Sequence, residues 1–187
     1  MGQLQGWIRS PVTFLGMAKR RPLPFDPVQE AARQWAHHFG GDAAVEPMRA
    51  VTSLMRVQQI VLARLDEVLR RYDLTFARYE ALVLLTFTRT GALPLGKMGE
   101  RLQVHPTSVT SIVRRLERDG LVRRTPHPED GRGVLAEVTD EGREVVKATT
   151  KDLVAMRFGL DALDDASLCT VHELLTLVRQ DAGDFLP

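Results

Sequence analysis

The 187-residue sequence has little cysteine, little net charge and no long apolar run. Its one cysteine, Cys169, excludes an intrachain disulfide, a cysteine-built zinc cluster and a CxxC redox pair, and it favours a reducing cytoplasm. With 25 Lys and Arg against 24 Asp and Glu, the net charge of +1 excludes nucleic-acid binding through bulk positive charge. The longest clean apolar stretch, residues 81–85, is far shorter than the roughly 20 residues of a membrane span. Residues 12–17 lack the cleavage site of a secretory signal, so no membrane or secreted form is expected.

The composition otherwise suits one globular protein with an N-terminal extension. Hydrophobic residues make up 44% and charged residues 26% of the chain, which is enough for a sizeable core. Residues 1–25 combine several prolines with the basic cluster Lys19, Arg20 and Arg21, so we expect a flexible arm there. Met17 has the context of a translation start, and on composition we expect residues 1–16 to lie outside the natural protein.

Two helices are predicted before residue 73. The first helix is expected over residues 26–39, within the N-terminal segment 26–41. It has Asp26 as N-cap, Pro27 at its first position and two glycines that end it. The second, residues 47–72, is apolar on two stripes and must therefore be covered on two sides. One stripe consists of Val51, Met55, Leu62, Leu65, Leu69 and Tyr72, and the other of Leu54, Val57, Val61 and Val68.

A similar helix is predicted at the C-terminal end, over residues 164–185. Its apolar residues are Leu168, Val171, Leu174, Leu175, Leu177 and Val178. Because broadly apolar helices stand at opposite ends of a small chain, we expect residues 47–72 and 140–187 to form the interface of a symmetric homodimer. The alternative is that both helices pack into the core of a monomer.

Residues 73–139 are predicted to form a winged helix-turn-helix. The expected helices are 75–88, 96–102, 106–118 and 140–158, the expected strands are 121–125 and 134–139, and residues 91–94 are expected to form a turn. This order of helices and hairpin is that of a winged DNA-binding domain. The predicted fold is mainly α with a small β-hairpin, in which dimerisation helices flank the winged domain.

The helix of residues 106–118 has the chemistry of a recognition helix. Val109, Ile112, Val113 and Leu116 share one face, which is expected to pack inward. Hydroxyls near a helix N-terminus bind phosphate or base edges, and arginine binds guanine or phosphate. The residues expected to contact DNA on this helix are Pro106, Thr107, Ser108, Thr110, Ser111, Arg114, Arg115 and Arg118.

The surroundings of this helix favour DNA binding over plain solvation of a surface helix. Between Lys97 and Arg132 there are eight Lys and Arg against five Asp and Glu, an excess that the whole-chain charge hides. Arg132, at the tip of the hairpin, is placed to enter a minor groove. Asp130 either positions an arginine or simply forms the turn.

Segments of this region closely resemble the MarR family of bacterial transcription regulators. They are residues 106–110, 116–124 and 128–134, the last leading into 138–143. The Asp-x-Arg of the hairpin followed by Thr-x-x-Gly is the most specific part, and the resemblance extends from about residue 47 to the C-terminus. It implies a homodimer on a palindromic operator, usually a repressor released by a small anionic or phenolic ligand. It also implies that residues 106–118 are the recognition helix and Arg132 the wing-tip arginine.

The added N-terminal helix with Trp35 is similar to one branch of that family, which responds to urate-like or other anionic metabolites. By this resemblance Trp35, Glu80 and Arg124 are expected to bind the ligand, although Trp35 serves equally well as a core anchor. Ser111 stands where that branch has a further arginine, which argues against urate itself.

No other motif indicates catalysis, a metal or a cofactor. His37 and His38 point apart on a helix, and His172 lacks the second histidine of HExxH. The sequence therefore predicts a cytoplasmic, nucleoid-associated regulator that is not an enzyme and whose partners are double-stranded DNA, a second copy and a small effector. Two alternatives stay open: a winged module that binds protein instead of DNA, and a thiol-based redox sensor acting through Cys169.

Overall fold

The structure, a computed structural model, describes residues 22–40, 44–127 and 133–186. The chain divides into two compact units, Met1–Ala63 and Arg64–Pro187. Helix α1 spans Pro27–Phe39 and follows the predicted signals: the Asp26 carboxylate accepts a hydrogen bond from N of Val28 at 2.9 Å, and Gly40 ends the helix at a φ of 92°. Helix α2 spans Val45–Leu69. Most of the predicted arm lies outside the described residues.

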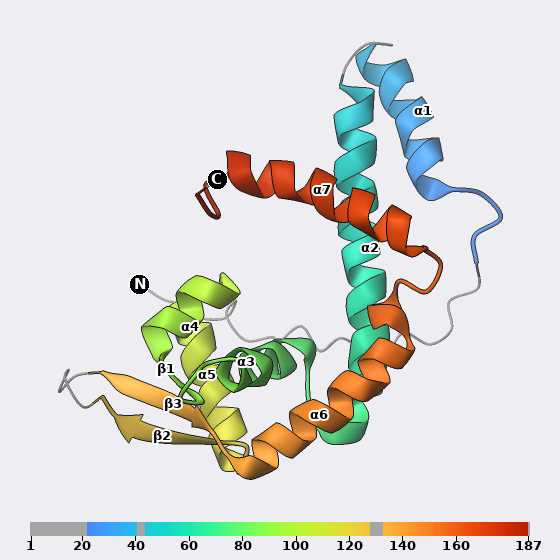
Figure 1. The fold of residues 1–187 in the computed structure, drawn as a ribbon. Coiled ribbons are helices and arrows are strands. Elements are labelled where there is room, and N and C mark those ends of the chain that lie inside the picture. Colours follow the sequence, from blue (N-terminus) through green and yellow to red (C-terminus); the bar gives the residue numbers. More distant parts are fainter. Residues whose placement is uncertain (1–21, 41–43, 128–132, 187) are drawn as a thin grey trace, which may run out of the picture. The chain divides into compact units, whose positions relative to one another are not determined.

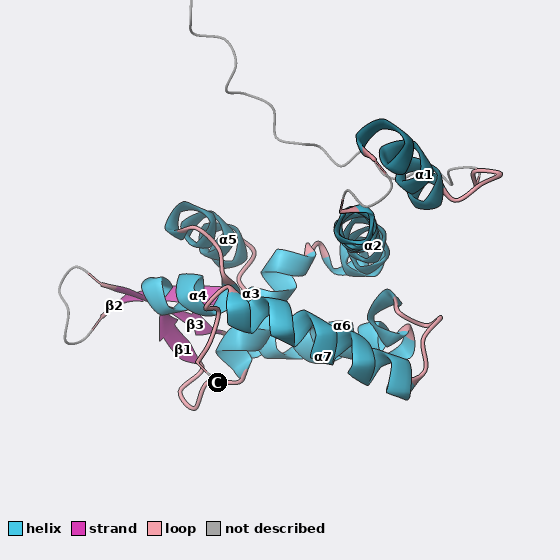
Figure 2. Ribbon diagram, turned by 90° about the horizontal axis from the view of Figure 1, so that it is seen from above, coloured by secondary structure: helices cyan, strands magenta, loops and turns pink. Residues whose placement is uncertain are grey.

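The second unit contains the winged helix-turn-helix that the sequence predicts. Its elements after α2 are η1 Arg70–Tyr72, α3 Phe76–Thr86, β1 Ala92–Pro94, α4 Leu95–Leu102, α5 Pro106–Arg118, β2 Val122–Pro126, β3 Val134–Val138, α6 Asp140–Ala155, η2 Arg157–Gly159 and α7 Asp165–Asp181. The strands form one antiparallel sheet in the order β1-β3-β2, beside α3, α4 and α5 (Figures 1 and 2). The mainly helical fold is thus confirmed.

The segment predicted as a turn before α4 is in part a strand, so that prediction was wrong. β1 pairs with β3 so that Leu93 lies opposite Ala136, and N of Val138 donates to the carbonyl oxygen of Gly91 at 2.9 Å. Gly91, at a φ of 71°, makes the turn just before the strand. Pro94 fits here because β1 lies at the edge of the sheet, where a missing N–H costs no ladder bond.

Side-chain caps fix where several helices begin. The Thr75 hydroxyl caps α3, the Thr139 hydroxyl accepts from N of Gly142 at 3.0 Å, and Asp164 accepts from N of Ser167 at 2.8 Å. The hydrogen bonds from Ser167 lower the pKa of the Asp164 carboxyl. Helix α6 ends at Ala155, three residues before the predicted end, because Arg157 and Phe158 adopt left-handed backbone angles.

The core of the second unit is formed by the inward faces of its helices. Its largest fully buried side chains are Leu69, Leu82, Leu85, Met98, Leu116, Leu153, Val109, Val113 and Thr149. Val109, Val113 and Leu116 confirm the predicted inward face of α5, where Ile112 is half-buried. The side of α5 that faces solvent is thereby fixed.

Two helices leave large apolar side chains uncovered within the single chain. On α2 these are Val51, Leu54, Met55, Val57 and Ile60, and on α7 they are Val171, Leu174, Leu175, Leu177 and Val178. None of the residues of α7 is buried. Apolar surface on this scale usually marks an interaction site. Among the helices in the described ranges, none is both long and apolar enough to cross a bilayer.

Candidate nucleic-acid interface

The first turn of α5 is held by short-range polar contacts. Nδ1 of His105 accepts a hydrogen bond from N of Thr107 at 3.3 Å and lies 2.8 Å from the Thr107 hydroxyl oxygen. The Thr110 hydroxyl donates to the carbonyl oxygen of Pro106 at 3.1 Å. The sequence predicted the start of this helix at Pro106 but missed the imidazole of His105 as its cap.

The solvent-facing side of α5 carries hydroxyls first and arginines further on. Of the predicted DNA contacts, Pro106, Thr107, Ser108, Ser111, Arg114, Arg115 and Arg118 are exposed, and Thr110 is half-buried. Within the described part of the chain, Arg114 and Arg115 make no hydrogen bond or ion pair. Their guanidinium donors are therefore available for phosphate oxygens or base edges.

Ion pairs connect the strands of the hairpin to each other and to α5. Nε of Arg124 on β2 lies 2.6 Å from a carboxylate oxygen of Glu117 on α5, and Arg123 pairs with Glu137 across the sheet at 2.9 Å. The strands thus hold a defined position beside α5. Arg132 and Asp130, at the predicted hairpin tip, lie outside the described residues, so the wing-tip assignment stays a prediction.

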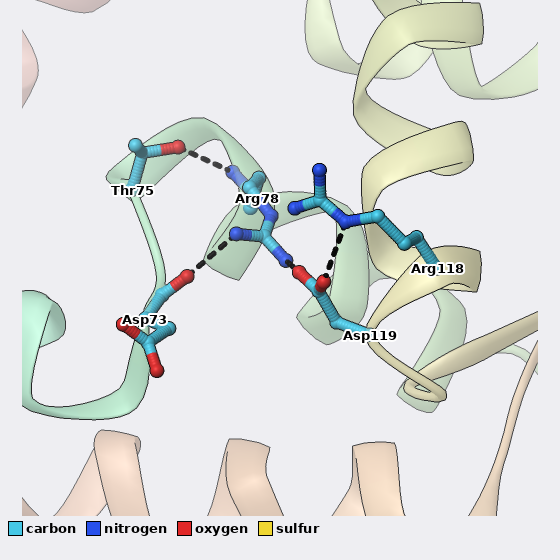
Figure 3. Close-up of polar contacts among 5 residues, drawn as sticks. All are labelled: Asp73, Thr75, Arg78, Arg118 and Asp119. Atoms are coloured by element: carbon cyan, nitrogen blue, oxygen red, sulfur yellow. Dashed lines mark hydrogen bonds and ion pairs between the residues drawn. The ribbon is translucent and has the colours of Figure 1, made fainter.

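A cluster around Arg78 joins the beginning of α3 to the end of α5 (Figure 3). Arg78 donates to the carbonyl oxygen of Asp73 at 2.5 Å and to the carboxylate of Asp119, the C-cap residue of α5. Nε of Arg118 donates to the other oxygen of the same carboxylate at 3.0 Å. Sequence reasoning missed this cluster, although Arg78 stands at helical spacing from Leu82 and Leu85 and so had to lie on a buried face.

Hydrogen bonds from Arg118 and Arg78 hold the pKa of the Asp119 carboxyl below its ordinary value of 3.8. Unfolding removes both partners, so the unfolded chain binds this proton more readily than the folded one. The stabilisation is therefore complete above the ordinary value and is lost as pH falls through the lower folded value. We expect the thermal midpoint of Asp119→Asn to fall less steeply than that of the unmodified protein below about pH 4. Circular dichroism melts over that range measure this, and equal slopes would count against the assignment.

The predicted effector residues lie on different elements of the chain. Trp35 lies on α1, where its ring centroid is 4.8 Å from that of Phe39. Glu80 is exposed on α3 and makes no hydrogen bond within the described residues, and partial desolvation raises its pKa. Arg124 pairs with Glu117 instead. The grouping of Trp35, Glu80 and Arg124 into one ligand site therefore stays a prediction.

The remaining candidate residues show no further site. Cys169 is a free, exposed thiol on α7. In the described segments no three His, Cys, Asp or Glu side chains gather as metal ligands.

Comparison with known proteins places this domain in a family. The model of the MarR family matches residues 76–134. PecS, an HTH-type transcriptional regulator of Dickeya dadantii, is 30% identical over 130 residues, which cover 68% of this chain and 76% of PecS. The solved structure of Sco5413, a MarR family transcriptional regulator from Streptomyces coelicolor, is 55% identical with a TM-score of 0.72, over 76% of this chain and 99% of Sco5413.

A second relative has been solved together with DNA. Sco3205, another MarR family transcriptional regulator from Streptomyces coelicolor, was solved in complex with DNA; it is 26% identical with a TM-score of 0.68, over 78% of this chain and 91% of Sco3205. These relatives are transcriptional regulators, which confirms that the chain is not an enzyme. The sequence match, the shared winged fold and the extent of coverage agree: the chain belongs to the MarR family of transcriptional regulators.

Proposed function

We propose that this protein is a homodimeric repressor that binds a palindromic operator in double-stranded DNA and is released from it by a small anionic or phenolic effector. The exposed face of α5 carries this proposal, because the hydroxyls of Thr107 and Ser111 precede two unpaired arginines, Arg114 and Arg115. A relative with the same fold, Sco3205, binds DNA in its solved complex.

The buried side of α5 determines which side chains can meet DNA. A major groove about 12 Å wide admits one α-helix, and the inward-packed valines leave the opposite side of α5 to face the bases. Thr107 and Ser111 then lie at base edges near the helix start, while the arginines bind phosphate or guanine. Arg132, carried by the hairpin, enters the adjacent minor groove.

The uncovered apolar surfaces of α2 and α7 support the dimer, with residues 47–72 and 140–187 as dimerisation segments and 73–139 as the winged domain. A second copy of the chain is the partner that we propose for these exposed apolar side chains, since most oligomers pair the same surface of two identical chains. Two copies related by a two-fold axis present two recognition helices to half-sites about 34–36 Å apart, which is why the operator is palindromic.

Release by an effector follows from linkage. A ligand that binds more tightly to a dimer whose recognition helices are differently spaced lowers the affinity for DNA. DNA in turn lowers the affinity for the ligand by the same free energy. Arg124 offers one route, because an anion that draws it away from Glu117 removes the ion pair between β2 and α5. Trp35, Glu80 and Arg124 remain our candidate contacts for that ligand.

Base readout by α5 is tested by comparing hydroxyl and arginine variants. We expect Thr107→Val and Ser111→Ala to lower the preference for a selected duplex, enriched by the unmodified protein from a randomised pool, by about tenfold. Arg118→Ala is expected to weaken binding to selected and random duplexes alike, since it removes phosphate affinity. Fluorescence anisotropy measures both affinities, and Lys147→Ala, which removes an exposed charge on α6, is the control. Equal losses on selected and random duplexes for the Thr107 and Ser111 variants would count against base readout.

A further inference from the structure

Arg78 is the only charged side chain that is buried among the described residues, with 8% of its surface exposed. A buried guanidinium is costly unless charged and polar groups surround it. Its two terminal nitrogens have such partners, the Asp73 carbonyl oxygen and the Asp119 carboxylate, whereas Nε has none. Burying a guanidinium on the inner face of α3 costs more free energy than burying a leucine there. We therefore expect Arg78 to have a function that a leucine could not serve.

The two partners of Arg78 belong to segments far apart in the chain. Asp73 precedes α3 at a φ of 52°, and Asp119 ends α5, where N of Asp119 donates to the Arg115 carbonyl oxygen at 3.1 Å. α3 is in turn anchored on α6, because the Tyr79 hydroxyl lies 2.8 Å from the Thr150 hydroxyl. Arg78 therefore ties the last turn of the recognition helix to a helix that the rest of the unit holds in place.

The same carboxylate also holds an arginine on the DNA side of α5. Asp119 accepts hydrogen bonds from buried Arg78 through one oxygen and from exposed Arg118 through the other (Figure 3). We propose that Arg78 is a positioning residue for DNA recognition, which sets the angle of α5 and, through Asp119, the direction of the Arg118 side chain. This inference rests on the proposed DNA-binding function.

Loss of Arg78 would have two separable consequences. The Asp119 carboxylate would keep only the exposed Arg118 as a partner, which lowers stability and draws that cation away from phosphate. The end of α5 would also lose its link to α3, so Thr107 and Ser111 would meet the bases at a different angle. The first consequence is electrostatic and is relieved by Asp119→Asn, whereas the second is geometric and is not.

The test uses the single variants Arg78→Met and Arg78→Lys and a double variant that combines Arg78→Met with Asp119→Asn. For each, we measure the thermal midpoint and, by anisotropy, the affinity for selected and random duplexes. The matched control is Arg71→Met, which removes one positive charge and an ion pair to Asp152 of 3.1 Å without touching α5. We expect the double variant to recover most of the thermal midpoint lost in Arg78→Met, yet to keep an approximately tenfold loss of selectivity for the selected duplex. In Arg78→Lys, which keeps a cation beside Asp119, the selectivity for the selected duplex is expected to fall about threefold, and in Arg71→Met it is expected to fall less than twofold.

Each outcome decides the inference. Full selectivity in the double variant or, should that variant not fold, in Arg78→Lys would overturn it, because Arg78 would then serve stability alone. Equal weakening on both duplexes in the double variant would overturn it as well, because the selectivity that depends on the angle of α5 would then be intact. Failure of the unmodified protein to enrich any duplex is distinguishable from these results, because it would overturn the proposed function together with this inference.

Discussion

Replacing Leu174 and Val178 by glutamate is expected to convert the protein to a monomer and to abolish tight operator binding. Both side chains are uncovered on α7, with 60% and 65% of their surfaces exposed in the single chain. Covering such a side chain in an interface contributes about 1.5–3 kcal/mol, and a carboxylate in its place must also lose its water. Each substitution occurs twice in a two-fold dimer. A loss of dimer affinity of at least about 100-fold is therefore expected.

Sedimentation velocity gives the oligomeric state and anisotropy gives the DNA affinity of the same samples. Gln180→Glu is the matched control, because it adds a carboxylate to an exposed polar position of the same helix. The control should remain dimeric and bind DNA normally. A dimeric double variant with unchanged DNA affinity would show that α7 does not form the dimer interface.

Gly142→Ala is expected to destabilise the winged domain by about 3 kcal/mol or more, because its methyl group has no space. The new Cβ would overlap the carbonyl oxygen of Leu121 and lie 2.9 Å from Cγ2 of Val138. The Leu121 oxygen is a backbone atom that already accepts from N of Thr139 at 3.1 Å, so it cannot rotate away. At this close approach the beginning of α6 meets Val138 at the end of β3 and Leu121, which follows the turn after α5. This is the physical reason for glycine in the Thr-x-x-Gly pattern.

Thermal melts at equal protein concentration measure this effect, since the proposed dimer would make the midpoint concentration-dependent. A midpoint lower by roughly 6–12 °C corresponds to the expected loss for a chain of this size. Gly96→Ala is the control: a Cβ there meets no atom within 4 Å, and alanine favours the α4 helix, so stability should rise by about 0.5–1 kcal/mol. A Gly142→Ala protein as stable as the unmodified one would refute the packing argument.

Local signals in the sequence were sufficient to place most helices. Asp26 before Pro27, the proline at Pro106, and Asp164 each mark a helix start that the structure has at the same position. These signals work because a cap and the helix it begins are neighbours in the chain. The inward face of α5 could likewise be predicted, because the helical period of 3.6 residues puts its apolar side chains on one side.

Features that depend on distant partners were not predictable in the same way. β1 consists of three residues that become a strand by pairing with β3, more than 40 residues later. Arg78 had a local signal of burial, but its partner Asp119 lies 41 residues away in sequence. The early end of α6 arises from left-handed angles at Arg157 and Phe158, where neither glycine nor proline precedes the break.

Binding to the selected duplex across a salt series tests most directly whether α5 binds DNA. The unmodified protein should bind this duplex far more tightly than a random one, with an affinity that falls steeply as salt rises, because phosphate contacts release counterions. Replacing both Arg114 and Arg115 by alanine should reduce the slope of log affinity against log salt by about two for each α5 bound. Binding no tighter than to random DNA, or an unchanged slope in the double variant, would contradict the account.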